Sequence, residues 1–274
     1  MESLLYIRFA VSLVYAAAAA SYVMLLLGKA RRGLPTRLLV TGLLLHLTEV
    51  IVRGAEAGAA GGAPFVGSSG FVSIFAFLLG VIYLALEHRY KVPTLGAFHI
   101  PVVFSIQAAG AILKQPVTAI PHLKTGYLVA VHVVPTVVAY AALTASFVAA
   151  VAYLLLDRQL RKKTFGVLMR GLPNLDLVEA VNTAGVRIGT PLLMLGSVVG
   201  LAVGYHAFGA EYHWDLKNFV TFAIVAIYSA QLLLRRFAGF TGRRSVLLSC
   251  LGFSVVALGI TVINVFFSPM HGLT

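Results

Sequence analysis

Long apolar stretches alternate with short polar ones along the whole chain. Crossing a bilayer as a helix takes roughly 20 apolar residues. Stretches of about that size cover residues 4–27, 38–53, 71–88, 94–113, 126–156, 185–205, 218–235 and 245–267. Stretch 38–53 is the shortest, and 126–156 is long enough to project beyond the lipid. The pattern predicts an all-α, polytopic membrane protein with about eight transmembrane helices.

Composition also indicates that lipid is the solvent. Apolar residues make up 59% of the 274 residues and charged residues only 11%, where a soluble domain carries about 25% charge. The mean hydropathy is +0.94. The loops are too short to hold a second core, so we expect a single transmembrane domain over residues 1–274. The first stretch is long for a signal peptide and is expected to remain as a helix.

Basic residues predict the orientation of the helices. The net charge is +12, and the odd-numbered loops hold most of the lysines and arginines, whereas the even-numbered loops hold only Lys114, Lys124 and Lys217. The positive-inside rule then places the odd loops in the cytoplasm and both termini outside, in the cell (inner) membrane. Because the charge reports orientation, no nucleic-acid partner is expected. Range 157–184 is predicted to hold a short amphipathic helix on the inner surface.

Histidines supply the candidate chemistry. His132 and His271 both fall on the outer side of the predicted topology, and two neutral imidazoles from opposite sides can ligate one haem iron. Spacing alone is only a weak indication of this, and plain structural roles stay open. His46 lies midway through the second stretch, three residues before Glu49. Ionisable groups inside a membrane are usually functional, although these two side chains could simply hydrogen-bond each other.

Aromatic residues crowd the outer loop that follows the sixth stretch. Tyr205, Phe208, Tyr212 and Trp214 fall within ten residues of one another, followed by Asp215 and Lys217. One interpretation is an aromatic belt at the membrane interface. The other is a platform for a flat macrocycle, with the two charged side chains contacting its propionates. Cys250 is the only cysteine, so the chain has no Cys-x-x-Cys-His motif for covalent haem.

This loop resembles the tryptophan-rich signature W-G-x-x-W-x-W-D-x-K-E of the cytochrome c assembly family, of the CcsA/ResC type. Phe208 and Tyr212 keep aromatic character where the family has Trp, Asn218 replaces Glu, and the outright matches are Gly209, Trp214, Asp215 and Lys217. The helix 187–200, the helix that follows His132 and the segment 264–272 resemble the family as well. His46 and Arg53 resemble its N-terminal half more loosely.

The resemblance implies a function, a cofactor and a site. In the family, haem is presented at the outer face to apocytochrome c, beside a membrane partner with a large extracytoplasmic domain. If the family's haem ligands are transferred to this chain, haem b would be ligated by His132 and His271. The predicted haem-binding set is completed by Phe208, Gly209, Tyr212, Trp214, Asp215, Lys217 and His46. The chain would then be a haem-ligating component of the cytochrome c synthase type.

Two alternatives remain open on the sequence. The family has a further histidine in the helix after the motif, and the stretch Tyr228 to Arg235 has none. This difference favours a HemX-type regulatory membrane protein, which binds haem without ligating it to a substrate. A transporter without haem is the other alternative. The two halves show no convincing repeat, and the polar groups cluster outside rather than at the midplane, which disfavours a transporter.

Overall fold

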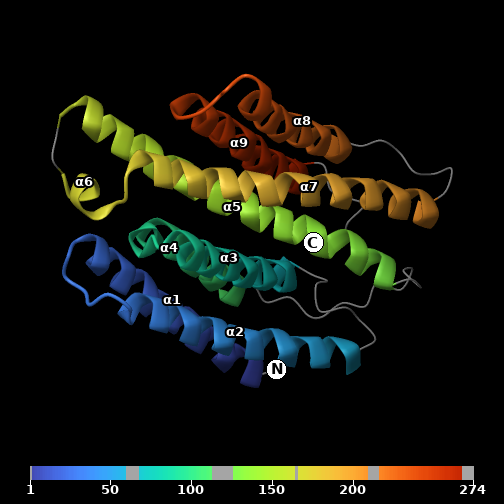
Figure 1. Ribbon diagram of the computed structural model, residues 1–274. Coiled ribbons are helices and arrows are strands. Elements are labelled where there is room, and N and C mark those ends of the chain that lie inside the picture. The colour runs from blue at the N-terminus through green and yellow to red at the C-terminus, as the bar shows by residue number, and fades with distance from the viewer. Residues whose placement is uncertain (1, 60–67, 113–125, 164–165, 209–215, 267–274) are drawn as a thin grey trace. The chain divides into compact units, whose positions relative to one another are not determined.

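The computed structural model describes residues 2–59, 68–112, 126–163, 166–208 and 216–266, a few of them by backbone alone. Its regular elements within these ranges are all helical (Figure 1). They are α1 (Glu2–Leu26), α2 (Leu34–Ala59), α3 (Ser68–Tyr90), the 3₁₀ turn η1 (Pro93–Leu95), α4 (Gly96–Ile112), α5 (Gly126–Arg161), α6 (Val167–Gly171), α7 (Leu175–Phe208), α8 (Leu216–Phe237) and α9 (Arg243–Phe266).

The predicted membrane-spanning helices are present. Among the described residues, 7 helices are long and apolar enough to cross a bilayer, and they correspond to the first seven predicted stretches. The eighth stretch, 245–267, coincides with α9, whose side chains are described only as far as Gly259. The chain is therefore an all-α, polytopic, integral membrane protein, as predicted. The side of the membrane on which each terminus lies stays a prediction.

Range 157–184 holds a short helix, as predicted, but the rest of the range belongs to its long neighbours. Helix α5 continues to Arg161, α6 spans only Val167–Gly171, and α7 already begins at Leu175. Lys163 ends the first of these helices because it adopts a left-handed backbone with φ 54°. Pro173 cannot continue a helix, and the Asn174 side chain then caps α7 by accepting a hydrogen bond from the Leu177 N–H at 3.0 Å.

The helices form two compact units. Unit 1 contains residues 1–122 and 152–181, and unit 2 contains residues 123–151 and 182–274. Helices α5 and α7 therefore contribute to both units. Each unit is described below by itself, and the expectation of a single domain over 1–274 stays a prediction.

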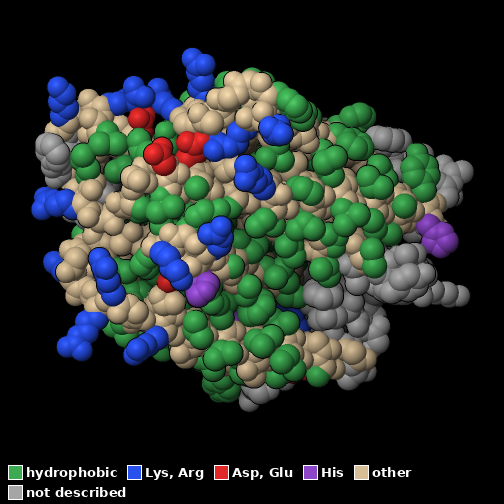
Figure 2. Space-filling model, in the orientation of Figure 1, with side chains coloured by type: hydrophobic (Ala, Val, Ile, Leu, Met, Phe, Trp, Pro, Cys, Tyr) green, Lys and Arg blue, Asp and Glu red, His purple; other side chains and the backbone are tan. Residues whose placement is uncertain are grey.

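In unit 1, α1 lies against α2 and α4, and α3 lies against α4 (Figure 1). Glu87 joins these helices at one end, because it accepts hydrogen bonds from the hydroxyls of Tyr22 at 2.6 Å and Thr36 at 2.5 Å. These bonds bring the end of α1, the start of α2 and the end of α3 to the same place. The basic loops of unit 1 thus share one end, where Lys and Arg side chains gather (Figure 2). The alternating charge pattern predicted this common end.

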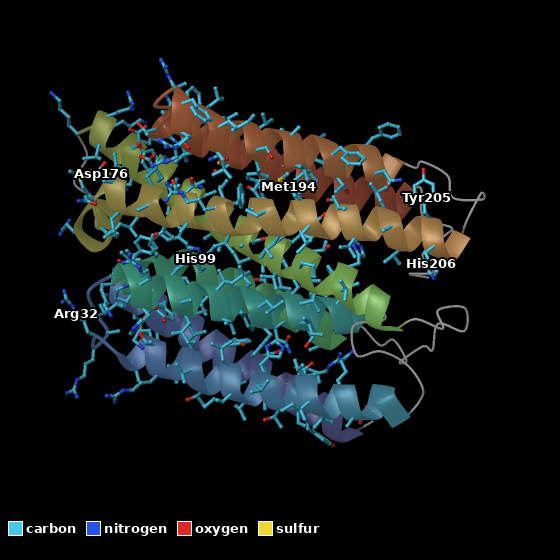
Figure 3. All side chains as sticks on the ribbon, turned by 45° about the vertical axis from the view of Figure 1, so that its right-hand side comes forward. Arg32, His99, Asp176, Met194, Tyr205 and His206 are labelled. Atoms are coloured by element: carbon cyan, nitrogen blue, oxygen red, sulfur yellow. The ribbon has the colours of Figure 1, made fainter. Side chains whose placement is uncertain are left out.

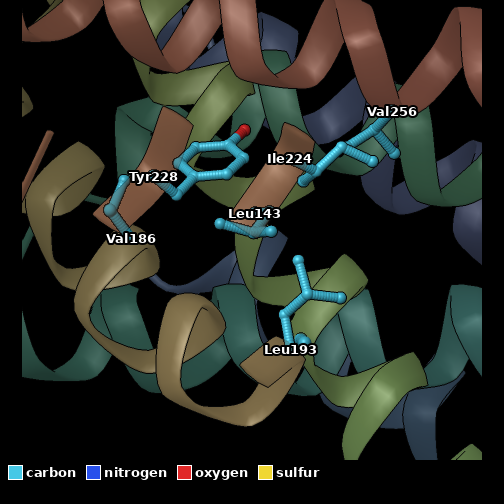
Figure 4. Close-up of a cluster of buried hydrophobic side chains, with 7 residues drawn as sticks. Leu143, Val186, Leu193, Ile224, Tyr228 and Val256 are labelled. Atoms are coloured by element: carbon cyan, nitrogen blue, oxygen red, sulfur yellow. The ribbon is translucent and has the colours of Figure 1, made fainter. Parts of the chain in front are cut away.

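In unit 2, glycines let α7 approach α5 closely. A Cβ atom added to Gly185 would lie 2.6 Å from the carbonyl oxygen of Ala142, and similar clashes would arise at Gly189, Gly196 and Gly200. Small residues serve this purpose in membrane helices, where close van der Waals packing replaces the hydrophobic effect. Around this contact lies a core of Ala139, Leu143, Val186, Leu193, Ile224, Tyr228 and Val256 (Figure 4).

A buried hydrogen-bond network joins the helices of unit 2. The Asn182 amide on α7 donates to the hydroxyls of Ser146 on α5 at 2.8 Å and Ser249 on α9 at 2.9 Å. Gln231 on α8 donates to the same Ser249 hydroxyl at 2.8 Å. Polar groups inside a membrane have no water to bond, so they must find partners in the protein. The network therefore fixes how these four helices align.

Candidate functional site

His132 is held in one orientation by the backbone of α7. This half-buried histidine lies on α5, and its Nδ1 is 2.8 Å from the carbonyl oxygen of Gly196. A carbonyl oxygen only accepts hydrogen bonds, so Nδ1 must carry the proton. The lone pair then resides on Nε2, the other ring nitrogen. Histidines that ligate metals are oriented by this kind of outer hydrogen bond.

Gly200 makes the space that the imidazole occupies. A Cβ atom at this position would lie 2.5 Å from Cε1 and 2.7 Å from Nδ1 of His132. One turn earlier, Gly196 leaves room for Thr136, whose hydroxyl donates to the His132 carbonyl oxygen at 2.7 Å. Two glycines four residues apart thus set both the position of the ring and the tautomer that it adopts.

The predicted aromatic loop begins near this histidine. Helix α7 ends at Phe208 and α8 starts at Leu216. Phe208 is eight residues beyond Gly200, so the loop begins about 12 Å further along the helix axis. Tyr205 and His206 are exposed at this end of α7 (Figure 3). The start of the loop and His132 therefore belong to the same end of unit 2.

Most other predicted haem-binding residues lie outside the described residues. These are Gly209, Tyr212, Trp214, Asp215 and His271, while Phe208 and Lys217 are described by their backbone alone. The pairing of His132 with His271 and the platform Phe208–Lys217 therefore stay predictions. What the structure adds is the geometry of one member of the pair.

His46 has a different environment. It is fully buried in unit 1, where its Nδ1 lies 3.0 Å from the Tyr15 hydroxyl and its Nε2 lies 3.0 Å from the Ser73 hydroxyl. Both ring nitrogens are thus engaged in hydrogen bonds. The haem-binding role predicted for His46 from the sequence would require one of these bonds to break.

Comparison with known proteins identifies the family. Residues 63–271 match the family described as Cytochrome C assembly protein. The match covers well over half of the chain. The chain belongs to the cytochrome c assembly protein family. His132 and the aromatic loop fall within the matched range, whereas His46 precedes it.

Individual relatives agree with this assignment. The chain is 26% identical over 271 residues to the cytochrome c biogenesis protein CcsA of Parasynechococcus marenigrum (strain WH8102), covering 89% of this chain and 87% of that protein. CcsA of Prochlorococcus marinus (strain MIT 9301) is 27% identical over 69% of this chain and 68% of its own length. Protein HemX of Brevibacillus brevis is 26% identical over 59% of this chain, and the match spans only 60% of HemX.

Sequence reasoning missed the partners of Glu49. This carboxylate has no exposed surface, and it accepts hydrogen bonds from Arg8 Nε at 3.1 Å, Ser73 Oγ at 2.9 Å and Gln107 Nε2 at 2.7 Å. The network joins α1, α2, α3 and α4. The available signal was the presence of polar residues inside four apolar stretches, but their pairing depends on contacts up to 58 residues apart.

Proposed function

We propose that this chain is a haem-binding membrane protein of cytochrome c biogenesis, located in the cell (inner) membrane. It would hold haem b at the outer face between His132 and His271 and present it for attachment to apocytochrome c. The observation that carries the proposal is the 2.8 Å contact between His132 Nδ1 and the Gly196 carbonyl oxygen, which leaves Nε2 as a metal ligand. Membership of the cytochrome c assembly family supports it independently.

The residues present fit this cofactor. Neutral imidazole is a usual axial ligand of haem iron, and a backbone carbonyl on the far nitrogen increases its basicity. His271 would supply the second imidazole. Phe208, Tyr212 and Trp214 would contact the macrocycle through their rings, while Lys217 would pair with a propionate and Asp215 would form a salt bridge with Lys217. Gly209 would permit the chain to turn beneath it.

The role of the protein in this proposal is to position haem. When bound, haem supplies vinyl groups that react with cysteine thiols of an apocytochrome. The His132 imidazole would fix the distance and tilt of the macrocycle relative to the membrane, and the aromatic loop would exclude water from one face. Correct positioning of two reactants is itself a large contribution to rate. The chain would thus be a component of the cytochrome c synthase type.

A membrane partner with a large extracytoplasmic domain belongs to the proposal. The connection between α4 and α5, residues 113–125, is the longest between consecutive helices of this chain. A segment of this length is too short to fold into a domain that binds an apoprotein. Recognition of apocytochrome c is therefore assigned to the partner, and haem binding to this chain.

A HemX-like regulatory protein is the second candidate. Two observations favour it: the segment Tyr228–Arg235 of α8 contains no histidine, and the chain is 26% identical to Protein HemX over 162 residues. Such a protein would bind haem at the same residues without transferring it to a substrate. Haem binding by itself therefore does not separate the two candidates.

Two measurements test the proposal in sequence. Haem added to the purified full chain should give a six-coordinate, low-spin spectrum, as two histidine ligands produce. Expression of the chain in a strain that lacks its CcsA-type protein should then restore c-type cytochromes. A low-spin spectrum without restored cytochromes would favour the HemX-like candidate. No change in the Soret band on adding haem would contradict both.

A further inference from the structure

We propose that a basic pocket in unit 2 binds the phosphate group of an anionic phospholipid in the inner leaflet. The pocket has a volume of about 340 Å³ and is lined by Arg187, Leu232, Arg235, Arg236 and Thr241. Arg187 precedes Gly200 by thirteen residues, so the pocket lies about 20 Å along α7 from the His132 ring. It is separate from the proposed haem site and does not depend on it.

The lining suits a phosphate. Three of its five residues are arginines, none is acidic, and Thr241 adds a hydroxyl group. Each guanidinium group is always charged and presents five N–H donors in a planar fork that matches the oxygens of a phosphate. The three guanidinium groups, which come from two helices, carry three positive charges, so the lining would stay positive even beside one carboxylate. A phosphate diester with further polar headgroup oxygens would use these donors together.

The fold brings these residues together from separate parts of the chain. Arg187 projects from the interior of α7, while Arg235 and Arg236 belong to the last turn of α8. After α8, Gly239 adopts a left-handed backbone with φ 62°, and the Phe240 N–H donates to the Leu234 carbonyl oxygen at 3.2 Å. This turn directs the chain back over the end of α8, which places Thr241 at the pocket.

Arg187 is the informative member of the set. Arginines at the end of α8 are expected from the positive-inside rule alone. Arg187, however, is not in a loop, because α7 begins twelve residues earlier at Leu175. An exposed arginine inside a helix that crosses a membrane needs a polar environment, and a lipid headgroup provides one. Arg187 lines the same pocket as Arg235 and Arg236. Three arginines around one pocket form a defined site, whereas scattered arginines would only make the surface positive.

The depth of the pocket matches the headgroup region. The uncharged run 188–205 that follows Arg187 spans about 27 Å, and the uncharged run 219–234 of α8 spans about 24 Å. The hydrocarbon core of a bilayer is about 30 Å thick. If the outer ends of both helices lie at the outer interface, the three arginines lie where inner-leaflet phosphates are found. Basic pockets between helices on this side of a membrane favour anionic headgroups.

Exposed apolar residues beside the pocket point to a lipid rather than a soluble anion. Ile188 is 45% exposed, Leu233 56% and Phe237 81%, and each adjoins a residue that lines the pocket: Arg187, Leu232 and Arg236 respectively. In a membrane such surfaces contact acyl chains. A ligand with a phosphate next to two acyl chains would satisfy the arginines and these apolar residues at once, whereas inorganic phosphate would satisfy only the arginines.

Native mass spectrometry of the detergent-solubilised full chain tests this inference. Phosphatidylglycerol and phosphatidylcholine with identical acyl chains are titrated onto the protein. Wild type should retain phosphatidylglycerol preferentially. The double variant Arg187→Gln/Arg236→Gln should weaken that retention roughly tenfold or more, because each basic residue contributes appreciably to anionic-lipid binding. The single variant Arg187→Gln removes one exposed side chain and serves if the double variant does not fold.

The matched control is Arg243→Gln/Arg244→Gln. It removes two charges from the inner end of the same unit, but neither residue lines the pocket. Retention by this variant should stay within about twofold of wild type, because its pocket arginines are intact. Equal loss in both double variants would overturn the proposal in favour of diffuse attraction. Equal retention of the two lipids by wild type, or displacement of lipid by inorganic phosphate at millimolar concentration, would overturn it as well.

Discussion

At the scale of single residues, the proposed haem site depends on a contact between a glycine and an imidazole. His132 could be selected from the sequence because it lies on the predicted outer side of an apolar helix. Its partner could not be selected, because Gly196 is 64 residues away and contributes a backbone oxygen that any residue possesses. Only the packing of α5 on α7 reveals why the ring has one tautomer.

Gly200 provides the sharpest test of this contact. In the variant Gly200→Ala the added methyl group would overlap the imidazole, so the ring must leave its position. We expect haem affinity to fall about 10- to 100-fold, the range seen when the support of a metal ligand is removed. Titration followed by the Soret band measures it. Gly58→Ala, at a position with open space, is the control and should bind haem as wild type does.

Glu49 lies at the centre of the buried polar network of unit 1. The variant Glu49→Ala leaves the buried Arg8 guanidinium without its carboxylate, and breaking such a pair costs about 3–5 kcal/mol. We expect a correspondingly lower thermal midpoint in detergent. Glu56→Ala removes a less buried carboxylate from the same helix and should change stability by less than about 0.5 kcal/mol. Equal effects of the two variants would show that the network is not what stabilises the unit.

At the scale of helices, the sequence predicts most of the structure because apolar length determines what can cross a membrane. The first seven predicted stretches all coincide with helices. The short helix predicted between α5 and α7 is present as α6, but its bounds could not be predicted, because the amphipathic pattern spans Lys163 and Pro173, which interrupt the helix. Local backbone geometry, rather than hydrophobic periodicity, decided that segment. The proposed lipid site was not predicted, because Arg187 was counted inside the apolar stretch 185–205.

Helix alignment in unit 2 depends on Asn182. Replacing it by alanine removes hydrogen bonds to α5 and α9 at once, so the Ser146 hydroxyl loses this donor and the Ser249 hydroxyl keeps only the bond from Gln231. We expect a loss of about 1–2 kcal/mol, the upper part of the range for polar contacts between membrane helices. Unfolding in mixed micelles measures it. Ser254→Ala is the control, since the Ser254 hydroxyl bonds only to the Cys250 carbonyl oxygen of its own helix.

At the scale of the whole molecule, the two units carry different kinds of polar chemistry. Unit 1 contains the network around Glu49, whose two charged members, Arg8 and Glu49, precede residue 63, where the match to the cytochrome c assembly family begins. Unit 2 contains His132, both helices that flank the aromatic loop, and the arginine pocket. This division indicates that unit 1 supports the fold and that unit 2 holds the proposed binding sites.

The division predicts the behaviour of His46→Ala. This change removes two hydrogen bonds within unit 1 and should lower stability. It should leave the low-spin haem spectrum of the purified chain largely unchanged, because the proposed ligands belong to unit 2. Optical spectra of wild type and variant, recorded at equal haem saturation, make the comparison. If the variant loses the spectrum, a site at the middle of the membrane is the real one.

The most direct measurement combines ligand removal with chemical rescue. His132→Gly and His271→Gly are each loaded with haem, and their spectra are recorded before and after adding free imidazole. Two axial histidines predict that each variant becomes five-coordinate and that imidazole, entering the space left by the side chain, restores the low-spin spectrum. A normal low-spin spectrum in both variants without imidazole would contradict the account.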